Sequence, residues 1–265
     1  MSKWVVEQFG KKPKLNSPIF IEGLPGIGNV GKVVVDFMIE KMNAKKLYEF
    51  HSASFPHSVF VNEDNLIDLP KIEIYYKKMK GKKDLIFLAG DIQPIDEESC
   101  YMFTDKLLDL CGEYGVKEII TIGGIGLQTI PKKPAVYCTG NDKKIIAKYK
   151  KGTGINEKLY GIVGPIVGVT GILLGLSQPR KIPAIALLAE TFGHPLYLGV
   201  KGAREILKVL NKKINLKINL KDLDKEISTL ESEMMKRTEE FSNISKRTAL
   251  KKLKSKIKGE TSYIG

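Results

Sequence analysis

The stretch Ile19-Phe-Ile-Glu-Gly-Leu-Pro-Gly-Ile-Gly-Asn-Val-Gly-Lys32 decides the fold of this chain. A short apolar run over residues 19–22 ends in a turn rich in glycine and proline. Apolar side chains then recur at helical spacing, from Val30 to about Met42, with charged residues on the other face. A buried strand followed by a tight turn and an amphipathic helix is the first unit of an α/β fold.

The glycines of this turn match a dinucleotide-binding motif. Gly26, Gly28 and Gly31 fit G-x-G-x-x-G, in which glycines let the backbone approach a pyrophosphate at the amino end of a helix. Glu49 stands at about the distance where an acid holding the ribose is expected. Pro25 departs from the usual entry into such a turn, and the same glycines equally suit a tight strand-to-helix turn that only packs.

A second motif, the phosphate-binding loop G-x-x-x-x-G-K, overlaps the first. Gly26, Gly31 and Lys32 fit it, but Val33 occupies the position where Ser or Thr would coordinate Mg²⁺. The sequence therefore argues against an ATPase of this class. A nucleotide-binding enzyme using Gly26, Gly28, Gly31 and Glu49, with NAD, FAD or ATP, remains the alternative function.

The same periodicities predict the rest of the core. Strands are expected at residues 4–6, 46–52, 72–76, 84–90, 118–122, 135–139, 145–147 and 184–189. Helices are expected at residues 100–114 and 195–210, and the glycine-laced apolar segment 161–177 is expected to form a buried helix or a subunit contact. Residues 53–70 are predicted to form an insertion with a short hairpin. Strands alternating with helices indicate a mostly parallel sheet with helices on both faces.

Four predicted turns should meet at one edge of that sheet. They cover residues 23–31, 90–96, 123–126 and 190–194, and each follows a strand. Ligands of such folds bind outside the carboxyl ends of the strands. This edge is therefore the expected place for a pocket.

Acidic residues also follow the strands, but they do not form a recognisable catalytic set. Glu22, Asp91, Asp96 and Glu190 could supply an acid/base pair, and loop acids equally serve as helix caps. The three histidines, His51, His57 and His194, share no helix face and no cysteine stands at ligand spacing from them, which argues against zinc. No G-x-S-x-G elbow is present. We expect no catalytic residue, no metal and no cofactor.

Composition indicates a soluble protein with an acidic partner. Of 265 residues, 43% are hydrophobic and 28% charged, and the net charge is +13. Such a balance favours an acidic protein surface or nucleic acid. Cys100, Cys111 and Cys138 form no CxxC pair, so free thiols in the cytoplasm are expected. The amino terminus has no apolar signal region, and a membrane span in the glycine-rich segment 161–177 is not expected.

The last fifty residues have a different pattern. Apolar residues from Leu220 to Ile244 alternate steps of three and four, as in a heptad seam. Between Ser245 and Lys258 there are seven bases and no acid. Because this run has no interleaved aromatics, it argues against specific nucleic-acid recognition. We expect three regions: an α/β core (1–213), a basic helical arm (214–258) and a flexible tail (259–265).

Five motifs together resemble the archaeal proteasome assembly chaperone family. They lie at residues 23–32 (GLPGIGNVGK), 90–94 (GDIQP), 121–124 (TIGG), 164–176 (ending GILLGL) and 188–191 (LAET), in the order the family has them. The resemblance covers roughly residues 18–210. It implies a three-layer, phosphorylase-like α/β core, no catalysis, a cytoplasmic homo-oligomer with or without a paralogue, and α-subunits of the proteasome core particle as partners.

The resemblance also implies a partner-binding carboxyl terminus. Family members end in a hydrophobic residue, a tyrosine and one last residue, which dock between α-subunits. This chain ends Tyr263-Ile264-Gly265, with the tyrosine one place earlier than in that motif. Tyr263, Ile264 and Gly265 are nevertheless the expected partner-binding residues, and assembly chaperone is the expected function.

Overall fold

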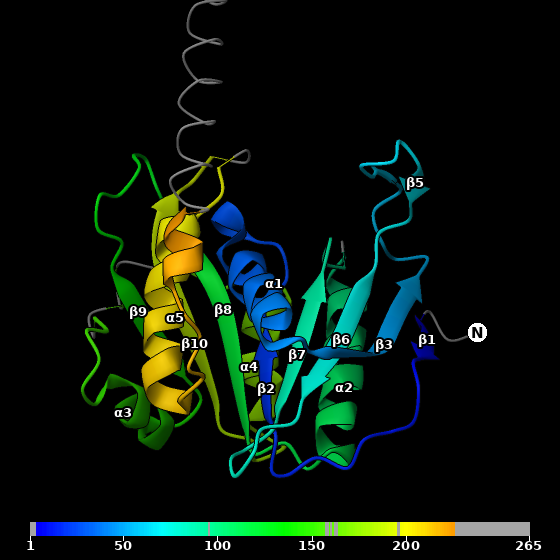
Figure 1. The fold of residues 1–265 in the computed structure, drawn as a ribbon, viewed down its shortest axis with the longest axis horizontal. Coiled ribbons are helices and arrows are strands. Elements are labelled where there is room, and N and C mark those ends of the chain that lie inside the picture. Colours follow the sequence, from blue (N-terminus) through cyan, green and yellow to red (C-terminus); the bar gives the residue numbers. More distant parts are fainter. Residues whose placement is uncertain are drawn as a thin grey trace, which may run out of the picture. The chain divides into compact units, whose positions relative to one another are not determined.

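The computed structural model describes residues 4–94, 96–156, 159, 161, 164–194 and 197–225. The chain divides into two compact units, Met1–Ile218 and Asn219–Gly265. All of the named helices and strands belong to the first unit, which is a sheet covered by helices on both faces (Figure 1). Of the second unit the structure describes residues 219–225, in which Leu223 is buried.

An eight-stranded sheet forms the middle layer, in the order β1-β3-β6-β7-β2-β8-β10-β9. Its strands are β1 (Trp4–Gln8), β2 (Ile19–Glu22), β3 (Lys45–Ser52), β6 (Ile72–Lys77), β7 (Leu85–Gly90), β8 (Glu118–Leu127), β9 (Val136–Gly140) and β10 (Ala184–Phe192). The central strands β7, β2, β8 and β10 pair in parallel, and antiparallel strands flank them. Since β3 also runs with the central four, the predicted mostly parallel α/β sheet is confirmed.

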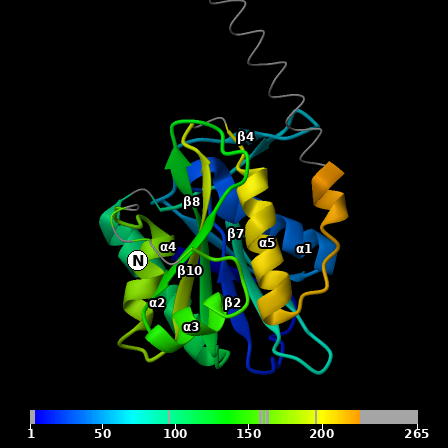
Figure 2. The ribbon, with the colours of Figure 1, turned by 90° about the vertical axis from the view of Figure 1, so that its left-hand side faces the viewer.

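Helices cover the two faces in pairs. Figure 2 shows α1 (Val30–Met42) and α5 (Val200–Ile214) on one side of the sheet, and α2 (Glu97–Glu113) and α4 (Val169–Ser177) on the other. The short helix α3 (Lys143–Lys150) packs against β9 and β10. Every residue of β2 and β7 is buried, because these strands have helices on both sides.

An aromatic cluster attaches α2 to the antiparallel end of the sheet. Phe103 on α2 stacks on Trp4 of β1 with ring centroids 4.6 Å apart, and it meets Phe50 of β3 edge to face at 5.3 Å. All three side chains are buried. The edge strand β1 is thus fixed by packing as well as by its pairing with β3.

The insertion between β3 and β6 forms the predicted short hairpin. Its strands are β4 (Phe60–Val61) and β5 (Ile67–Asp68), which pair with each other and form a separate two-stranded sheet. Asn62 shapes the turn, because its side-chain Oδ1 accepts hydrogen bonds from the amides of Asp64 and Leu66. The hairpin stands beyond the edge of the main sheet (Figure 1).

Two predictions of secondary structure in the second half of the core were wrong. Residues 123–126 are not a turn: β8 continues through the glycines to Leu127 and pairs with β10 from Ile119 to Leu127. Residues 145–147 are not a strand but lie in α3, where Asp142 caps the helix by accepting from the amide of Lys144. Ile145 and Tyr149, four residues apart, form its buried face.

Two helices differ from their predicted bounds. Among the described residues of the apolar segment 161–177, Val169–Ser177 form the helix, and Gly168 precedes it with φ +78°, a left-handed conformation that suits glycine. Residues 197–199 are not helical and the last predicted helix begins at Val200, whereas β10 extends to Phe192 through part of the predicted turn 190–194. The three cysteines are free, as predicted, and all three are buried.

Candidate functional site

The glycine turn forms a single 3₁₀ turn, Ile27–Asn29, before α1. Gly28 has φ +61° and Asn29 φ +50°, so the chain needs left-handed conformations here. A side chain at Gly28 would meet the Thr191 hydroxyl 2.5 Å away. The carbonyl of Gly28 also accepts a hydrogen bond from the amide of Gly199, which ties the turn to the start of α5.

The other glycines let the turn lie directly on the sheet. A Cβ at Gly31 would stand 2.5 Å from the carbonyl oxygen of Ile122 on β8. A Cβ at Gly124 would stand 2.2 Å from the carbonyl oxygen of Ile27. Backbone thus packs on backbone at both positions. Gly26 differs, because its backbone is extended (φ −159°) and a Cβ there would meet nothing within 4 Å.

Lys32 does not reach toward the glycine turn as a phosphate-binding lysine would. Its ammonium group donates to the carbonyl of Gly90 at 3.0 Å and pairs with Asp36 at 3.0 Å and Asp91 at 3.5 Å. These contacts hold the side chain against the end of β7. The lysine therefore connects α1 to the sheet.

Glu49 lies too far from the turn to hold a ribose there. It is on β3, and β6 and β7 separate that strand from β2. Strands in a sheet are about 4.8 Å apart, so roughly 14 Å of sheet intervenes. Glu49 instead pairs with Lys46 and with His51. Partial burial raises the pKa of the Glu49 carboxyl, but the neighbouring cations, chiefly Lys46, lower it below its usual value. The structure does not bring Glu49 together with Gly26, Gly28 and Gly31.

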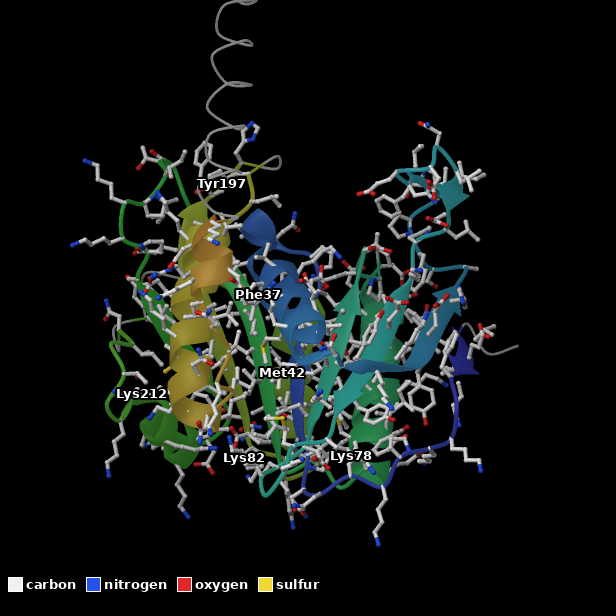
Figure 3. All side chains as sticks on the ribbon, in the orientation of Figure 1. Phe37, Met42, Lys78, Lys82, Tyr197 and Lys212 are labelled. Carbon is white, nitrogen blue, oxygen red and sulfur yellow. The ribbon has the colours of Figure 1, made fainter. Side chains whose placement is uncertain are left out.

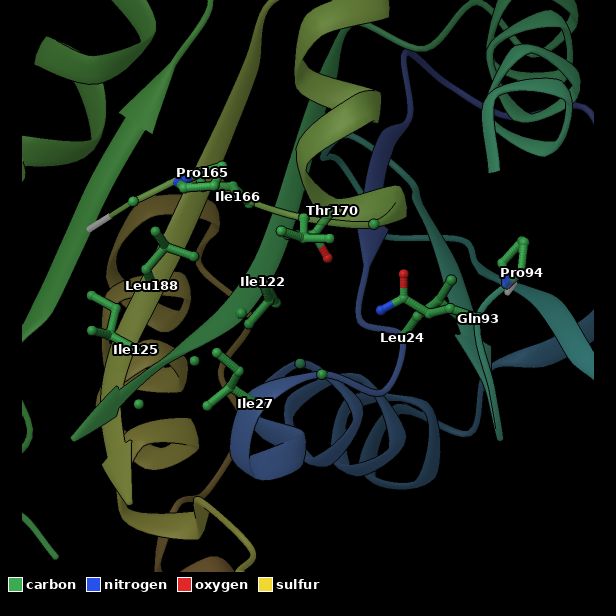
Figure 4. Close-up of a pocket in the computed structure, with 18 residues that line it drawn as sticks. Leu24, Ile27, Gln93, Pro94, Ile122, Ile125, Pro165, Ile166, Thr170 and Leu188 are labelled. Atoms are coloured by element: carbon green, nitrogen blue, oxygen red, sulfur yellow. The ribbon is translucent and has the colours of Figure 1, made fainter. Parts of the chain in front are cut away.

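A cleft of about 540 Å³ opens at the carboxyl ends of the parallel strands, and we call it the carboxyl-edge cleft. Its walls are the turn at Gly26 and Ile27, the loop at Gln93 and Pro94, β8 residues 122–126, and residues 164–168 with Thr170 of α4. Figure 4 shows the side chains of Ile27, Ile122 and Ile166 around it. Three of the four predicted segments therefore converge as expected, around a mostly apolar space.

The segment 164–168 is the wall that the sequence interpretation missed. It was assigned to a buried helix because its glycines share helical spacing with those of α4. Pro165 and Gly168 break that pattern and could have marked it as a loop. Gln93 fixes the segment, since its amide accepts from the amide of Val169 at 3.0 Å and donates to the carbonyl of Pro25.

Glu22 is buried beneath the cleft. Its Oε1 accepts hydrogen bonds from the amide of Leu24 at 2.9 Å and from the hydroxyl of Thr170 at 3.3 Å. Its Oε2 has no partner among the described residues. Burial raises the pKa of this carboxyl from 4.5 to about 7. Glu22 therefore connects the end of β2 to α4, at the cost of placing a carboxyl group out of water.

The other strand-end acids are separated and have structural partners. Glu190 accepts from the amide of Ala135 at 2.9 Å and from the hydroxyl of Tyr137 at 3.1 Å, which ties β10 to β9. Glu22 and Glu190 lie on strands with β8 between them. Asp91 pairs with Lys32, and Asp96 caps α2. The capping interpretation of Asp96 is confirmed.

Replacing Asp96 by Ala should cost about 1 kcal/mol of stability, the usual value of such a cap. The Asp96 carboxylate accepts from the amide of Ser99 at 2.8 Å, and alanine leaves that amide without its acceptor. Urea unfolding of D96A and D96N measures the loss. Asparagine retains an acceptor oxygen, so D96N should recover most of it; equal losses in both variants would contradict the capping role.

The remaining expectations concern the carboxyl-terminal residues, a metal site and a membrane span. Tyr263, Ile264 and Gly265, together with the heptad and basic segments after residue 225, lie outside the described residues. Within the described part of the chain, no group of three or more His, Cys, Asp or Glu side chains could hold a metal ion. None of the helices that the described residues form has the length and apolarity that crossing a membrane requires.

Together these features define a three-layer α/β protein with an apolar cleft at the carboxyl edge of its sheet. A family model described as PAC2 matches residues 20–238, and the chain belongs to that family. The resemblance read from the five motifs is thereby confirmed.

Two solved structures and one sequence relative are similar to the chain over most of its length. The crystal structure of Pyrococcus furiosus PbaB, an archaeal proteasome activator, is 32% identical with a TM-score of 0.80, over 89% of this chain and 99% of that one. P. furiosus PbaA, an archaeal homologue of proteasome-assembly chaperone, shares the fold at 22% identity and a TM-score of 0.71, over 94% and 98%. An uncharacterized protein of Methanocaldococcus jannaschii is 28% identical over 85% of this chain and 86% of its own.

Proposed function

We propose that this protein is a non-catalytic, cytoplasmic assembly chaperone that binds α-subunits of the archaeal proteasome core particle. Membership of the PAC2 family is the observation that carries the proposal. The relatives of known structure are named as a proteasome activator and a proteasome-assembly chaperone homologue. Contact through the carboxyl-terminal arm, with Tyr263, Ile264 and Gly265 at its end, is part of the same proposal.

The site geometry supports a binding role without a nucleotide. Gly31 and Gly124 are accounted for by close backbone packing between the turn and β8, Lys32 is held by carboxylates, and Glu49 lies three strands away from β2. We therefore assign no cofactor and no catalytic residue. Thermal shifts with saturating NAD, FAD and ATP check the alternative, because any ligand that binds the folded state raises its melting temperature.

Binding is tested by mixing the full chain with archaeal proteasome α-subunits and separating complexes by size. We expect a complex that is lost when residues 259–265 are deleted and weakened by Tyr263→Ala. Lys14→Ala, at an exposed lysine of the α/β core outside the arm, is the control and should bind as wild type does. If the α-subunits and the full chain elute separately at every salt concentration, the chaperone proposal is wrong.

A second candidate function is activation of the finished proteasome. The 32% identity and full-length match to an archaeal proteasome activator favour it specifically. The two functions differ in timing. A chaperone accelerates the appearance of core particles from separate subunits and leaves the peptidase rate of finished particles unchanged, whereas an activator raises that rate. Measuring both with the same protein preparation assigns the function.

A further inference from the structure

The hairpin β4–β5 presents an unusual amount of apolar surface. Six large apolar side chains in residues 59–69 are between 43% and 71% exposed: Val59, Phe60, Val61, Leu66, Ile67 and Leu69. Figure 3 shows the side chains of this hairpin clear of the main sheet. A two-stranded hairpin alone in water is only marginally stable, and clusters of exposed apolar groups mark binding sites. This hairpin therefore has the properties of a docking element.

The same hairpin is acidic. Residues 59–69 contain Glu63, Asp64 and Asp68 and no Lys or Arg, in a chain whose net charge is +13. None of these three carboxylates forms an ion pair with a described residue. Its partner surface should accordingly combine apolar area with positive charge.

The carboxyl-edge cleft and the loop that follows its β8 wall together have that combination. Ile27 and Val167 line the cleft and are 53% and 78% exposed. Directly beyond β8, the loop 128–135 adds Ile130, which is 52% exposed, and the exposed Lys132 and Lys133. Within the part of the chain that the structure describes, neither lysine has an acidic partner.

Another basic surface, the turn 77–83, fits less well. Its lysines lie at the opposite edge of the sheet, where Figure 3 labels Lys78 and Lys82. All residues of this turn are described, and none of them is an exposed large apolar residue. It could attract the acids of the hairpin but could not cover its apolar side chains.

Hairpin and cleft lie at the same edge of the sheet but over different strands. The hairpin leaves the end of β3 and returns to β6, whereas the cleft lies against β8 and the turn after β2, with β7 in between. The exposed fractions show that the hairpin does not fill its own cleft. Two different, complementary patches on one molecule produce a head-to-tail contact, which forms a ring when the rotation closes. Pairing hairpin to hairpin would instead oppose acid to acid.

We propose that the hairpin 59–69 of one copy docks into the carboxyl-edge cleft of a second copy. Apolar side chains of the hairpin cover Ile27 and Val167, and its acids face Lys132 and Lys133. A second copy is favoured over a proteasome subunit as the occupant because both complementary surfaces are present in this chain. The contact is separate from the carboxyl-terminal arm.

Size-exclusion chromatography with light scattering of the full chain tests this contact from both sides. Val61→Asp with Ile67→Asp places charges on the hairpin. Gly26→Leu fills the cleft from a position with extended backbone and free space. The wild type should be an oligomer, and each variant should dissociate with a Kd raised about 100-fold or more, as for lost interface hot spots. Tyr101→Asp on α2 and Gly154→Leu, both at exposed positions, should leave the oligomer intact.

Mixing the two variants separates this arrangement from a symmetric one. Gly26→Leu retains its hairpin and the hairpin variant retains its cleft, so an equimolar mixture should form 1:1 heterodimers and nothing larger. A charge swap provides a second check: Lys132→Glu with Lys133→Glu weakens association, and adding Glu63→Lys with Asp64→Lys restores it.

Three results would overturn the proposal. One is a wild-type oligomer that both variants leave intact. Another is an oligomer that the hairpin variant breaks but Gly26→Leu does not, which indicates pairing between hairpins. The third is a wild-type monomer whose hairpin is needed only for binding proteasome subunits. Circular dichroism of each variant confirms that it is folded before its mass is interpreted.

Discussion

Replacing Gly31 by Ala should lower the free energy of unfolding by about 2–3 kcal/mol, whereas Gly26→Ala should change it by less than about 0.5 kcal/mol. Both glycines belong to the same G-x-G-x-x-G motif, and the structure gives them opposite roles. The comparison therefore tests whether this motif serves packing or a ligand.

The reason for the difference is the distance from the turn to β8. A Cβ on Gly31 would lie 2.5 Å from the Ile122 carbonyl oxygen, which is a backbone atom and cannot move away as a flexible side chain could. Alanine favours the helix by about 1 kcal/mol over glycine, but this gain is smaller than the cost of displacing α1 from the sheet. At Gly26 a Cβ meets nothing within 4 Å.

Urea unfolding of the two variants measures the difference, and Gly124→Ala serves as the reciprocal variant. A Cβ at Gly124 would lie 2.2 Å from the Ile27 carbonyl oxygen, so G124A should resemble G31A. Equal stabilities of G26A and G31A would show that the turn does not pack as closely as the structure has it. If a pyrophosphate site existed, G26A would instead lose ligand-induced stabilisation while remaining as stable as wild type.

The sequence predicted the architecture well where a periodicity had a single interpretation. Ile19–Glu22, the helix from Val30 and the strand Leu85–Gly90 were all found because each is a buried run or an amphipathic repeat bounded by a turn. The glycines 123–126 were misread as a turn because a glycine within a strand looks the same in sequence as a glycine that ends it. Only the neighbouring backbone of Ile27 explains why β8 needs Gly124.

Predicting the site required knowledge of which strands are neighbours. Glu49 follows the motif at the right separation in sequence, but β6 and β7 insert between β3 and β2. The sequence predicts a hairpin in the insertion 53–70. Its proposed docking role, however, depends on how exposed its apolar side chains are, and periodicity does not reveal that for such short strands. Likewise, the sequence presents Glu22 as one of several acids at strand ends. Its burial becomes evident only in the structure, where Thr170 packs against it.

Glu22→Gln should remove most of the pH dependence of stability that this carboxyl imposes between pH 4.5 and pH 7. Burial raises the pKa of Glu22 from 4.5 to about 7. Between these values the unfolded chain has already lost the proton that the folded chain still holds, so raising the pH destabilises the wild type. A difference of about 2.5 pKa units corresponds to about 3 kcal/mol of unfolding free energy. This contribution is fully present below pH 4.5, falls progressively as the pH rises through the window, and is absent above the folded pKa.

Glutamine has nearly the same shape and never ionises. Its oxygen can retain the hydrogen bonds from the Leu24 amide and the Thr170 hydroxyl, while its NH₂ group takes the place of the oxygen that has no partner among the described residues. That buried NH₂ group adds a cost of its own, but the cost does not vary with pH. The stability of E22Q minus that of wild type should therefore increase by about 3 kcal/mol from pH 4.5 to pH 8.

Urea unfolding of both proteins across this range measures the change, with Glu7→Gln on the exposed side of β1 as the matched control. The control should give a pH profile parallel to that of the wild type. Parallel profiles for E22Q and wild type would instead show that Glu22 reaches solvent or a partner when ionised. If Glu22 reaches solvent, water must occupy the space between β2 and α4. A steeper profile for the wild type, as expected, assigns Glu22 a destabilising buried charge at neutral pH, which the fold retains to join β2 to the helix that borders the cleft.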